Sequence, residues 1–172
     1  MKTLLKYSGI ISAVLAIVTF ILLLATPGVI LTLKSSNADY DASGAVCIFG
    51  GDFKTTIFLY KCVATWAGLL AFILIIVALV ILICAIVLPL LKVKALDKFA
   101  GALNLVAVIS LILAGVFAFC IVAAFKSANK DVIVFNLYDV TIGAGWVIAG
   151  IIAIVAGVFA ILPAACDFIS KK

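Results

Sequence analysis

Four long stretches without a charged residue dominate the hydrophobic pattern of this chain. They cover residues 7–33, 63–91, 99–125 and 140–166. About 20 consecutive apolar residues are needed to cross the hydrocarbon core of a bilayer. Backbone polar groups in lipid must be satisfied within their own segment, which favours α-helices. The pattern therefore predicts an all-α membrane protein of one domain over 1–172, with four spans, outer loops 34–62 and 126–139, and an inner loop 92–98.

Small residues recur along the predicted spans with a period near 3.5 residues. On the fourth span they form a stripe, here called the small-residue seam, which comprises Gly143, Gly150, Ala153, Gly157, Ala160 and Ala164. Such a period favours left-handed crossing, and small side chains allow helix backbones to approach closely. We therefore expect a left-handed four-helix transmembrane bundle. The seam itself suits either packing within this bundle or a contact between protomers of a homo-oligomer.

The outer segments are rich in β-branched and aromatic residues. Ala45–Phe49 and Thr55–Tyr60 flank the sequence Gly50-Gly51-Asp52, which is typical of a hairpin turn. Val132–Tyr138 in the second outer loop has the composition of a third strand. We expect these strands to form a small extracytoplasmic β cap over the bundle, preceded by a polar loop over 35–43.

Composition and charge place the chain in a membrane and orient it there. Its residues are 69% hydrophobic and its mean hydropathy is +1.52, well above soluble domains. The two termini and the loop 92–98 carry seven lysines and two aspartates, whereas the two outer loops carry five of each. The positive-inside rule then predicts cytoplasmic termini in the cell (plasma) membrane. This topology explains the net charge of +5, so the predicted partner is the lipid bilayer and not nucleic acid.

Four large aromatic residues lie near the outer ends of the second and fourth predicted spans. They are Tyr60, Trp66, Tyr138 and Trp146. Tryptophan and tyrosine are enriched where a membrane protein meets the bilayer surface. The four residues are therefore expected to form an aromatic belt at that level.

Lysine and aspartate are the charged residues of this chain, which contains no Arg, Glu or His. Without His, the usual neutral-pH proton shuttle and the imidazole metal ligand are missing. Asp39 and Asp41 lie close together but lack the spacing of a calcium-binding loop. The predicted spans carry no charged side chain, which removes most support for proton-coupled transport. We therefore predict a protein that is not an enzyme, with no catalytic residue, no cofactor and no metal site.

Cys47 and Cys62 lie in the first outer loop, whereas the other three cysteines lie within predicted spans. An oxidising compartment favours a structural disulfide between these two residues. Closing a loop of about 15 residues would stabilise the fold by about 3 kcal/mol. Two free thiols are the alternative. Redox catalysis would favour a C-x-x-C pair, which this sequence does not contain.

The predicted topology resembles that of the claudin and peripheral myelin protein class. The shared features are four spans, inner termini, two cysteines in a long first outer loop, and a strand in the second. The resemblance covers the whole chain and implies a disulfide between Cys47 and Cys62. Claudins place a Trp and a Gly-Leu-Trp before the cysteine pair, whereas the nearest such run here is Trp66-Ala67-Gly68-Leu69. Junction formation is therefore not implied, and the lysine-rich, arginine-free composition looks more like that of a bacterial tetraspan protein.

The predicted function is non-enzymatic. We expect a multi-pass membrane protein whose disulfide-pinned β cap serves lateral or face-to-face assembly, as a homo-oligomer or with another membrane protein. Apolar residues of the outer loops are the candidate contacts, namely Ile48, Phe49, Phe53, Phe58 and Phe135. One alternative is a small oligomeric pore or an accessory subunit of a transporter, which needs a polar helix face. The other is a thiol-redox membrane enzyme, which needs a reactive cysteine pair.

Overall fold

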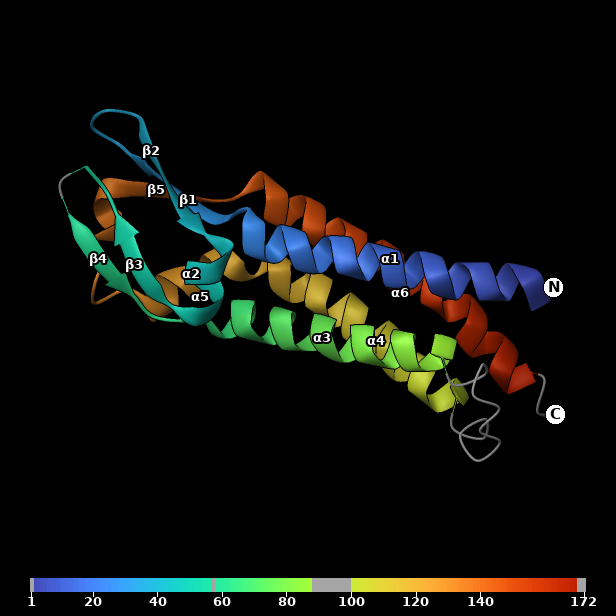
Figure 1. The fold of residues 1–172 in the computed structure, drawn as a ribbon. Coiled ribbons are helices and arrows are strands. Elements are labelled where there is room, and N and C mark those ends of the chain that lie inside the picture. The colour runs from blue at the N-terminus through green and yellow to red at the C-terminus, as the bar shows by residue number, and fades with distance from the viewer. Residues whose placement is uncertain (1, 57, 88–99, 170–172) are drawn as a thin grey trace.

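Four long helices run side by side and form the body of the molecule (Figure 1). The computed structural model describes residues 2–56, 58–87 and 100–169, and the surroundings of side chains in 7–56, 58–87 and 102–162. Each long helix contains an apolar stretch of between 18 and 22 residues, which is long enough to cross a bilayer. The prediction of a multi-pass membrane protein with four candidate spans is thereby confirmed. The helices are α1 (Lys2–Ala25), α3 (Trp66–Val87), α4 (Ala100–Phe119) and α6 (Ala144–Ile169).

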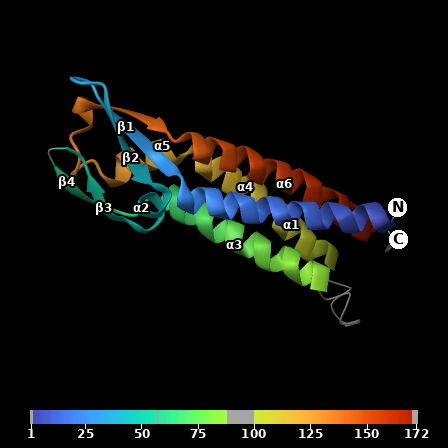
Figure 2. The same ribbon diagram turned by 45° about the horizontal axis from the view of Figure 1, so that its top comes forward.

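A cap of short elements covers one end of the four helices, away from both chain termini (Figures 1 and 2). The connection between α1 and α3 supplies most of it, and the connection between α4 and α6 supplies the rest. The predicted β cap is therefore present, although it also contains helices. In chain order its elements are β1 (Pro27–Leu33), β2 (Ala38–Ser43), α2 (Gly44–Phe49), β3 (Gly51–Lys54), β4 (Leu59–Cys62), α5 (Ile121–Ala128), the 3-10 helix η1 (Phe135–Leu137) and β5 (Tyr138–Ile142).

The strands form two antiparallel sheets. In the first, β1 lies between β2 and β5, so that both connections contribute to one sheet. Its register places Leu31 opposite Tyr40 on one side and opposite Val140 on the other. In the second sheet, β3 and β4 form a hairpin with Phe53 opposite Tyr60. Because side chains alternate between the two faces of a strand, these pairs define the inner face of each sheet.

Three of the uncharged runs contain more than a membrane helix. The run 7–33 is helical only to Ala25, and strand β1 begins at Pro27, because proline lacks a helical N–H and β-branched residues follow it. The run 99–125 is divided at Cys120 between α4 and α5, and the run 140–166 begins in β5. A strand buried in a cap is as free of charge as a membrane helix, so the charge pattern alone could not separate them. The predicted inner loop 92–98 lies outside the described residues.

Four expectations for the outer segments are wrong in detail. The segment 45–49 is the helix α2, whose first turn is capped by the Ser43 hydroxyl accepting from the Val46 amide (3.3 Å). The hairpin turn expected at 50–52 is absent, since β3 begins at Gly51. The expected strand 132–138 is replaced by η1, with β5 beginning only at its last residue, and β2 forms within the predicted loop 35–43. Packing against neighbouring elements has overridden local β propensity.

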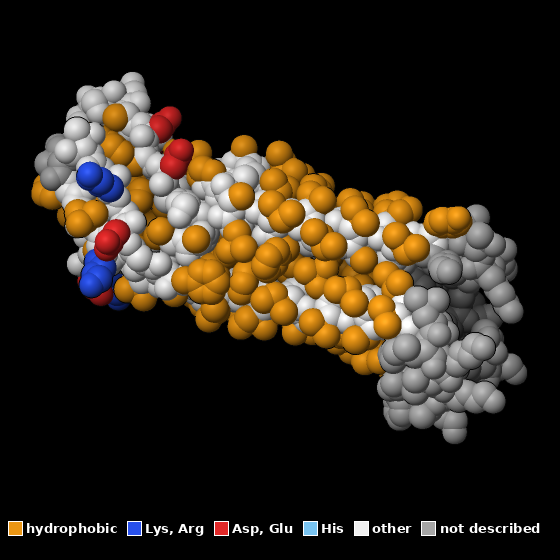
Figure 3. Space-filling model, viewed as in Figure 1, with side chains coloured by type: hydrophobic (Ala, Val, Ile, Leu, Met, Phe, Trp, Pro, Cys, Tyr) orange, Lys and Arg blue, Asp and Glu red, His pale blue; other side chains and the backbone are white. Residues whose placement is uncertain are grey.

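The helices pack through small side chains and present large apolar side chains outward. Helix α6 packs against α1 and α4, and α3 packs against the same two helices. Buried alanines line these contacts, including Ala71 of α3, Ala114 of α4 and Ala153 of α6. Figure 3 shows hydrophobic side chains along the visible length of the described helices, whereas charged side chains gather on the cap. This distribution is that of a protein whose helical body lies in lipid and whose cap lies in water.

A tryptophan joins the end of the first helix to the start of the last one. Residue 27 is a proline and has no N–H, so the Leu23 carbonyl oxygen cannot accept the usual helical bond from it. The Trp146 indole N–H donates to this oxygen instead (3.1 Å), and the Trp146 ring is fully buried. Gly44 fits in the same place because a Cβ there would meet the Leu23 carbonyl. Trp146 is therefore a packing residue of the junction and not a member of an interfacial belt.

Replacing Trp146 with Phe tests this hydrogen bond. The variant leaves the buried Leu23 carbonyl without a donor, and an unsatisfied buried group costs about 1–3 kcal/mol. We expect the free energy of unfolding in detergent to fall by at least that amount. Trp66→Phe is the matched control, because the Trp66 ring is half exposed and should tolerate the same change to within about 0.5 kcal/mol. Equal effects of the two variants would contradict the assigned role.

Candidate functional site

Three tyrosines join the two sheets of the cap through their inner faces. The rings of Tyr40 and Tyr138, both on the first sheet, meet edge to face at 6.4 Å. Partial burial, together with the neighbouring Tyr138 hydroxyl of the first sheet, raises the pKa of Tyr60 on β4 to about 12. The Tyr40 hydroxyl lies 2.8 Å from the Thr56 hydroxyl of the hairpin. The sheets therefore form two layers with a shared interior.

Two buried polar side chains hold the cap elements together next to the start of α3. The Thr65 hydroxyl, just before α3, donates to the Cys47 carbonyl oxygen (2.6 Å) and accepts from the Gly68 amide (3.1 Å). It therefore caps α3 and holds the end of α2 against it. The Asn129 side chain, at the end of α5, accepts from the Val63 amide (2.7 Å). Both residues are fully buried, so the cap has little freedom to tilt on the bundle.

Cys47 and Cys62 are free thiols, and the predicted disulfide is not formed. Because 44–49 is helical, the Cys47 sulfur lies 3.8 Å from the Ala42 carbonyl oxygen, whereas Cys62 lies on β4 opposite Gly51. Burial, with a smaller contribution from the Cys62 thiol, raises the pKa of Cys47 to about 12. Burial also raises the pKa of Cys62 to about 11. Both thiols are protonated at neutral pH, and a protonated thiol is a poor nucleophile.

The five candidate contact residues occupy different environments in the cap. Ile48 and Phe53 are buried in its core, and Phe135 is half-buried with its ring 6.3 Å from that of Phe125. Phe49 is exposed and its ring meets Phe72 of α3 edge to face at 5.1 Å, so it lies where the cap meets the bundle. Phe58 is exposed in the turn between β3 and β4.

Large apolar side chains are exposed on two segments at the end of the cap farthest from the helices. These segments are the β3–β4 turn and the chain around η1, which lie together in Figure 1. The sequence pattern predicted Phe58 as a contact residue, but not the other three side chains of this group. We call the group the distal apolar set, and its members are Phe58 (54% exposed), Leu59 (66%), Val134 (57%) and Leu137 (51%).

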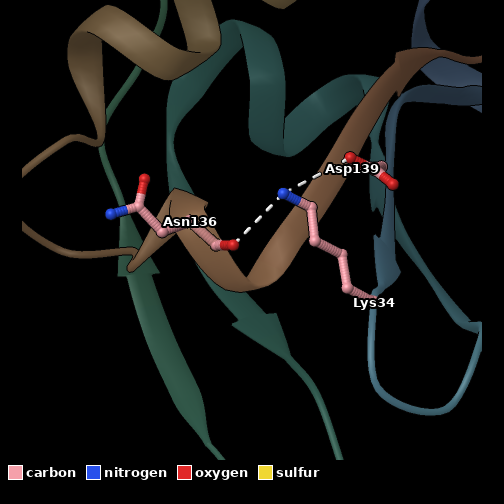
Figure 4. Close-up of polar contacts among 3 residues, drawn as sticks. All are labelled: Lys34, Asn136 and Asp139. Carbon is pink, nitrogen blue, oxygen red and sulfur yellow. Dashed lines mark hydrogen bonds and ion pairs between the residues drawn. The ribbon is translucent and has the colours of Figure 1, made fainter.

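Charged side chains occupy the solvent face of the three-stranded sheet. Figure 4 shows Lys34 between Asp139 and the backbone of Asn136. The Lys34 Nζ lies 3.6 Å from the Asp139 carboxylate and donates to the Asn136 carbonyl oxygen (3.2 Å). The Thr32 hydroxyl donates to the Asp39 carboxylate (2.6 Å). Among the described residues, no group of His, Cys, Asp or Glu side chains is arranged to hold a metal ion.

Most of the small-residue seam faces the neighbouring helix within the bundle. A Cβ on Gly150 would lie 2.9 Å from the Phe119 ring and 3.3 Å from the Gly115 carbonyl oxygen of α4. A Cβ on Gly157 would lie 2.9 Å from Ile112, also of α4. Ala153 and Ala160 are buried, Gly143 lies at the cap, and the surroundings of Ala164 are outside the described residues.

Replacing Gly150 with Leu should strain the contact between α4 and α6. Four added carbons would collide with Phe119 and the Gly115 backbone, and overpacking typically costs about 1–3 kcal/mol. We expect a lower unfolding temperature in detergent and an unchanged oligomeric mass. Ile151→Leu is the control, because Ile151 is exposed on the lipid side of α6. A fall in mass without loss of stability would instead place the seam between protomers.

The raised thiol pKa values predict slow alkylation of the native protein. At pH 8 a cysteine of ordinary pKa is about 10% thiolate, so a pKa of about 11 lowers the reactive fraction about a hundredfold. We expect Cys47 and Cys62 to react slowly with a maleimide at pH 8, faster towards pH 11, and completely after unfolding. Peptide mass spectrometry measures this for each residue. Rapid native alkylation at pH 8, or an absence of reaction until a reductant is added, would contradict the assignment of two buried free thiols.

A scan against protein-family models gives no match for this chain, and a search of curated proteins finds no relative. The resemblance to claudins therefore rests on predicted topology alone. The four candidate spans and the packed helical body identify the chain as a multi-pass membrane protein.

Proposed function

We propose that this chain is a non-enzymatic assembly protein that presents its cap on the extracytoplasmic side of a cell membrane. The observation that carries the proposal is the distal apolar set. Its four side chains are each more than half exposed at the end of the cap, whereas the interior of the cap is already filled by residues such as Leu31 and Phe53. Apolar side chains gathered on a water-facing surface are typical of a surface that binds another protein.

The packing of the cap supports a binding role over a catalytic one. The two cap thiols are buried and protonated at neutral pH, a state that suits packing and not nucleophilic attack. The cap is also held by buried hydrogen bonds at Thr65 and Asn129, so its surface is largely preformed. A preformed surface loses little conformational entropy when it binds a partner.

The polar side chains of the spans give less support to the pore alternative. The Ser12 hydroxyl of α1 donates to the Ala156 carbonyl oxygen of α6 (2.8 Å), and the Thr19 hydroxyl donates to the Leu15 carbonyl oxygen of its own helix (3.0 Å). Both residues are buried. The first bond holds α1 against α6 and the second lies within α1, and hydroxyls used in these ways are not presented to a water-filled channel.

Replacing two members of the distal apolar set should weaken assembly without unfolding the protein. We expect Phe58→Ser combined with Val134→Ser to weaken self-association in detergent and to abolish clustering of vesicles that carry the protein. Exposed positions tolerate such changes to within about 0.5 kcal/mol each, so the unfolding temperature should stay nearly constant. Native mass measures lateral association, and light scattering of the vesicles measures face-to-face association.

Phe49→Ser is the matched control for this experiment. Phe49 is as exposed as Phe58, but it contacts α3 at the base of the cap and should not take part in assembly. The proposal fails if the wild-type protein is a single protomer that clusters no vesicles, or if the double variant assembles as well as the wild type.

A further inference from the structure

The two sheets of the cap carry opposite net charge on their solvent faces. Residues directly paired across antiparallel strands share a face, so the register assigns each side chain. On the three-stranded sheet the solvent face, here the acidic face, comprises Ile30, Thr32, Asp39, Asp41, Asp139 and Thr141. Lys34, which follows β1, joins this face through its ion pair with Asp139. On the hairpin the solvent face, here the basic face, comprises Asp52, Lys54, Leu59 and Lys61. Each face also carries one apolar side chain, Ile30 on the acidic face and Leu59 on the basic face.

Both faces keep an excess charge. The basic face holds two lysines and Asp52, which stands opposite Lys61, so its net charge is one positive. Lys34 already neutralises Asp139, so Asp39 and Asp41 provide the excess negative charge of the acidic face. The Lys34–Asp139 contact is the one ion pair found within the described part of the chain. Lys54, Lys61 and Asp41 are exposed and take no part in it.

The two faces point in opposite directions. Tyr40 and Tyr138 lie on the inner face of the three-stranded sheet, and Tyr60 lies on the inner face of the hairpin. The Tyr40 hydroxyl lies 2.8 Å from the Thr56 hydroxyl of the hairpin, and Tyr40 and Tyr60 pack against the same buried core, so the inner faces are turned together. The acidic and basic faces are therefore on opposite sides of the cap. Two copies standing side by side can bring one face of each kind together.

The charges also lie at matching separations from the helices, counted in residues along the chain. Asp41 is paired with Ile30, which follows the end of α1 by five positions, and Lys61 precedes the start of α3 by five. Asp39 is paired with Thr32, seven positions beyond α1, and Lys54 is paired with Leu59, seven positions before α3. The membrane holds every copy at one height, so only groups at equal heights can meet laterally.

We propose that the lateral partner of the cap is a second copy of this chain, bound head to tail with the acidic face of one protomer against the basic face of its neighbour. Asp41 then meets Lys61, Asp39 meets Lys54, and Ile30 and Leu59 pack between the charges. Charge complementarity of this kind sets register and partner choice. A head-to-tail contact repeats to give a ring or an open row in the membrane plane. This inference rests on the proposed assembly function and names its partner.

Zero-length cross-linking tests the contact directly. The full chain is prepared unlabelled and with nitrogen-15, and the two preparations are mixed in bilayers. A carbodiimide then joins a lysine amine to an aspartate carboxylate in contact, forming an amide with loss of water. We expect Lys61–Asp41 and Lys54–Asp39 peptide pairs of mixed isotopic mass. Their absence in an assembled sample overturns the proposal.

Charge reversal tests whether the contact drives association. We expect D39K/D41K and K54D/K61D each to raise the dissociation constant of the oligomer, measured by sedimentation in detergent, by about tenfold or more, because like charges then face each other. An equal mixture of the two variants should regain the wild-type constant, since each new face is complementary to one on the other variant. K126D/K130D carries the same charge change as K54D/K61D on exposed residues of the cap outside both faces, and should leave the constant unchanged.

The outcomes separate this inference from the proposed function. If the wild type assembles and both reversed variants assemble equally well, the head-to-tail contact is wrong and assembly through another surface stands. If the wild type is a single protomer and clusters no vesicles, both proposals fail. Recovery in the mixture shows that each variant is folded, and loss without recovery overturns the charge-paired contact.

Discussion

The hydrogen bond from the Trp146 indole to the Leu23 carbonyl oxygen holds the fold together where the membrane helices give way to the cap. A helix that ends at a proline leaves a carbonyl without its donor, and inside a protein that deficit must be met by another group. Here the donor comes from α6, so the hydrogen bond that satisfies the end of α1 also places α6 beside it. The neighbouring carbonyl of Thr26 accepts from the Gly44 amide (2.9 Å), which brings α2 to the same place.

This junction explains why the cap is built from both the α1–α3 connection and the α4–α6 connection. Once α1 and α6 are joined, β1 leaving α1 and β5 entering α6 run next to each other and pair along five positions from Val29 to Leu33. The hairpin is a separate sheet, and a two-stranded hairpin is marginal by itself. It is stabilised by packing Tyr60 against Tyr138 and by the anchors at Thr65 and Asn129. The cap is thus a two-layer structure fixed to the bundle at several points.

The sequence predicts the helical body well and the cap poorly, for physical reasons. A bilayer requires long helices without charged residues, and each residue of a span such as 66–87 reflects this requirement. In the cap, local preference competes with contacts made far along the chain. Segment 45–49 looks like a strand but is helical because Ser43 caps it and Gly44 fits against Leu23. The expected disulfide rested on the oxidising compartment, which does not determine how the two sulfur atoms are placed, and Cys47 and Cys62 are free thiols. Proline at residue 27 was the available sign that the first run is too long for one helix.

The rigidity of the cap bears on how such a protein associates. Its inner faces are occupied by tyrosines and apolar side chains, so what it offers to another molecule is confined to its solvent faces and its distal end. Because four helices fix the height and tilt of the cap, a partner in the same membrane meets these surfaces at one level and in a few orientations. Surface charges are individually weak in water. When the membrane and a rigid scaffold have already restricted orientation, less entropy is lost on contact, and the same weak charges and exposed apolar side chains suffice to select a partner.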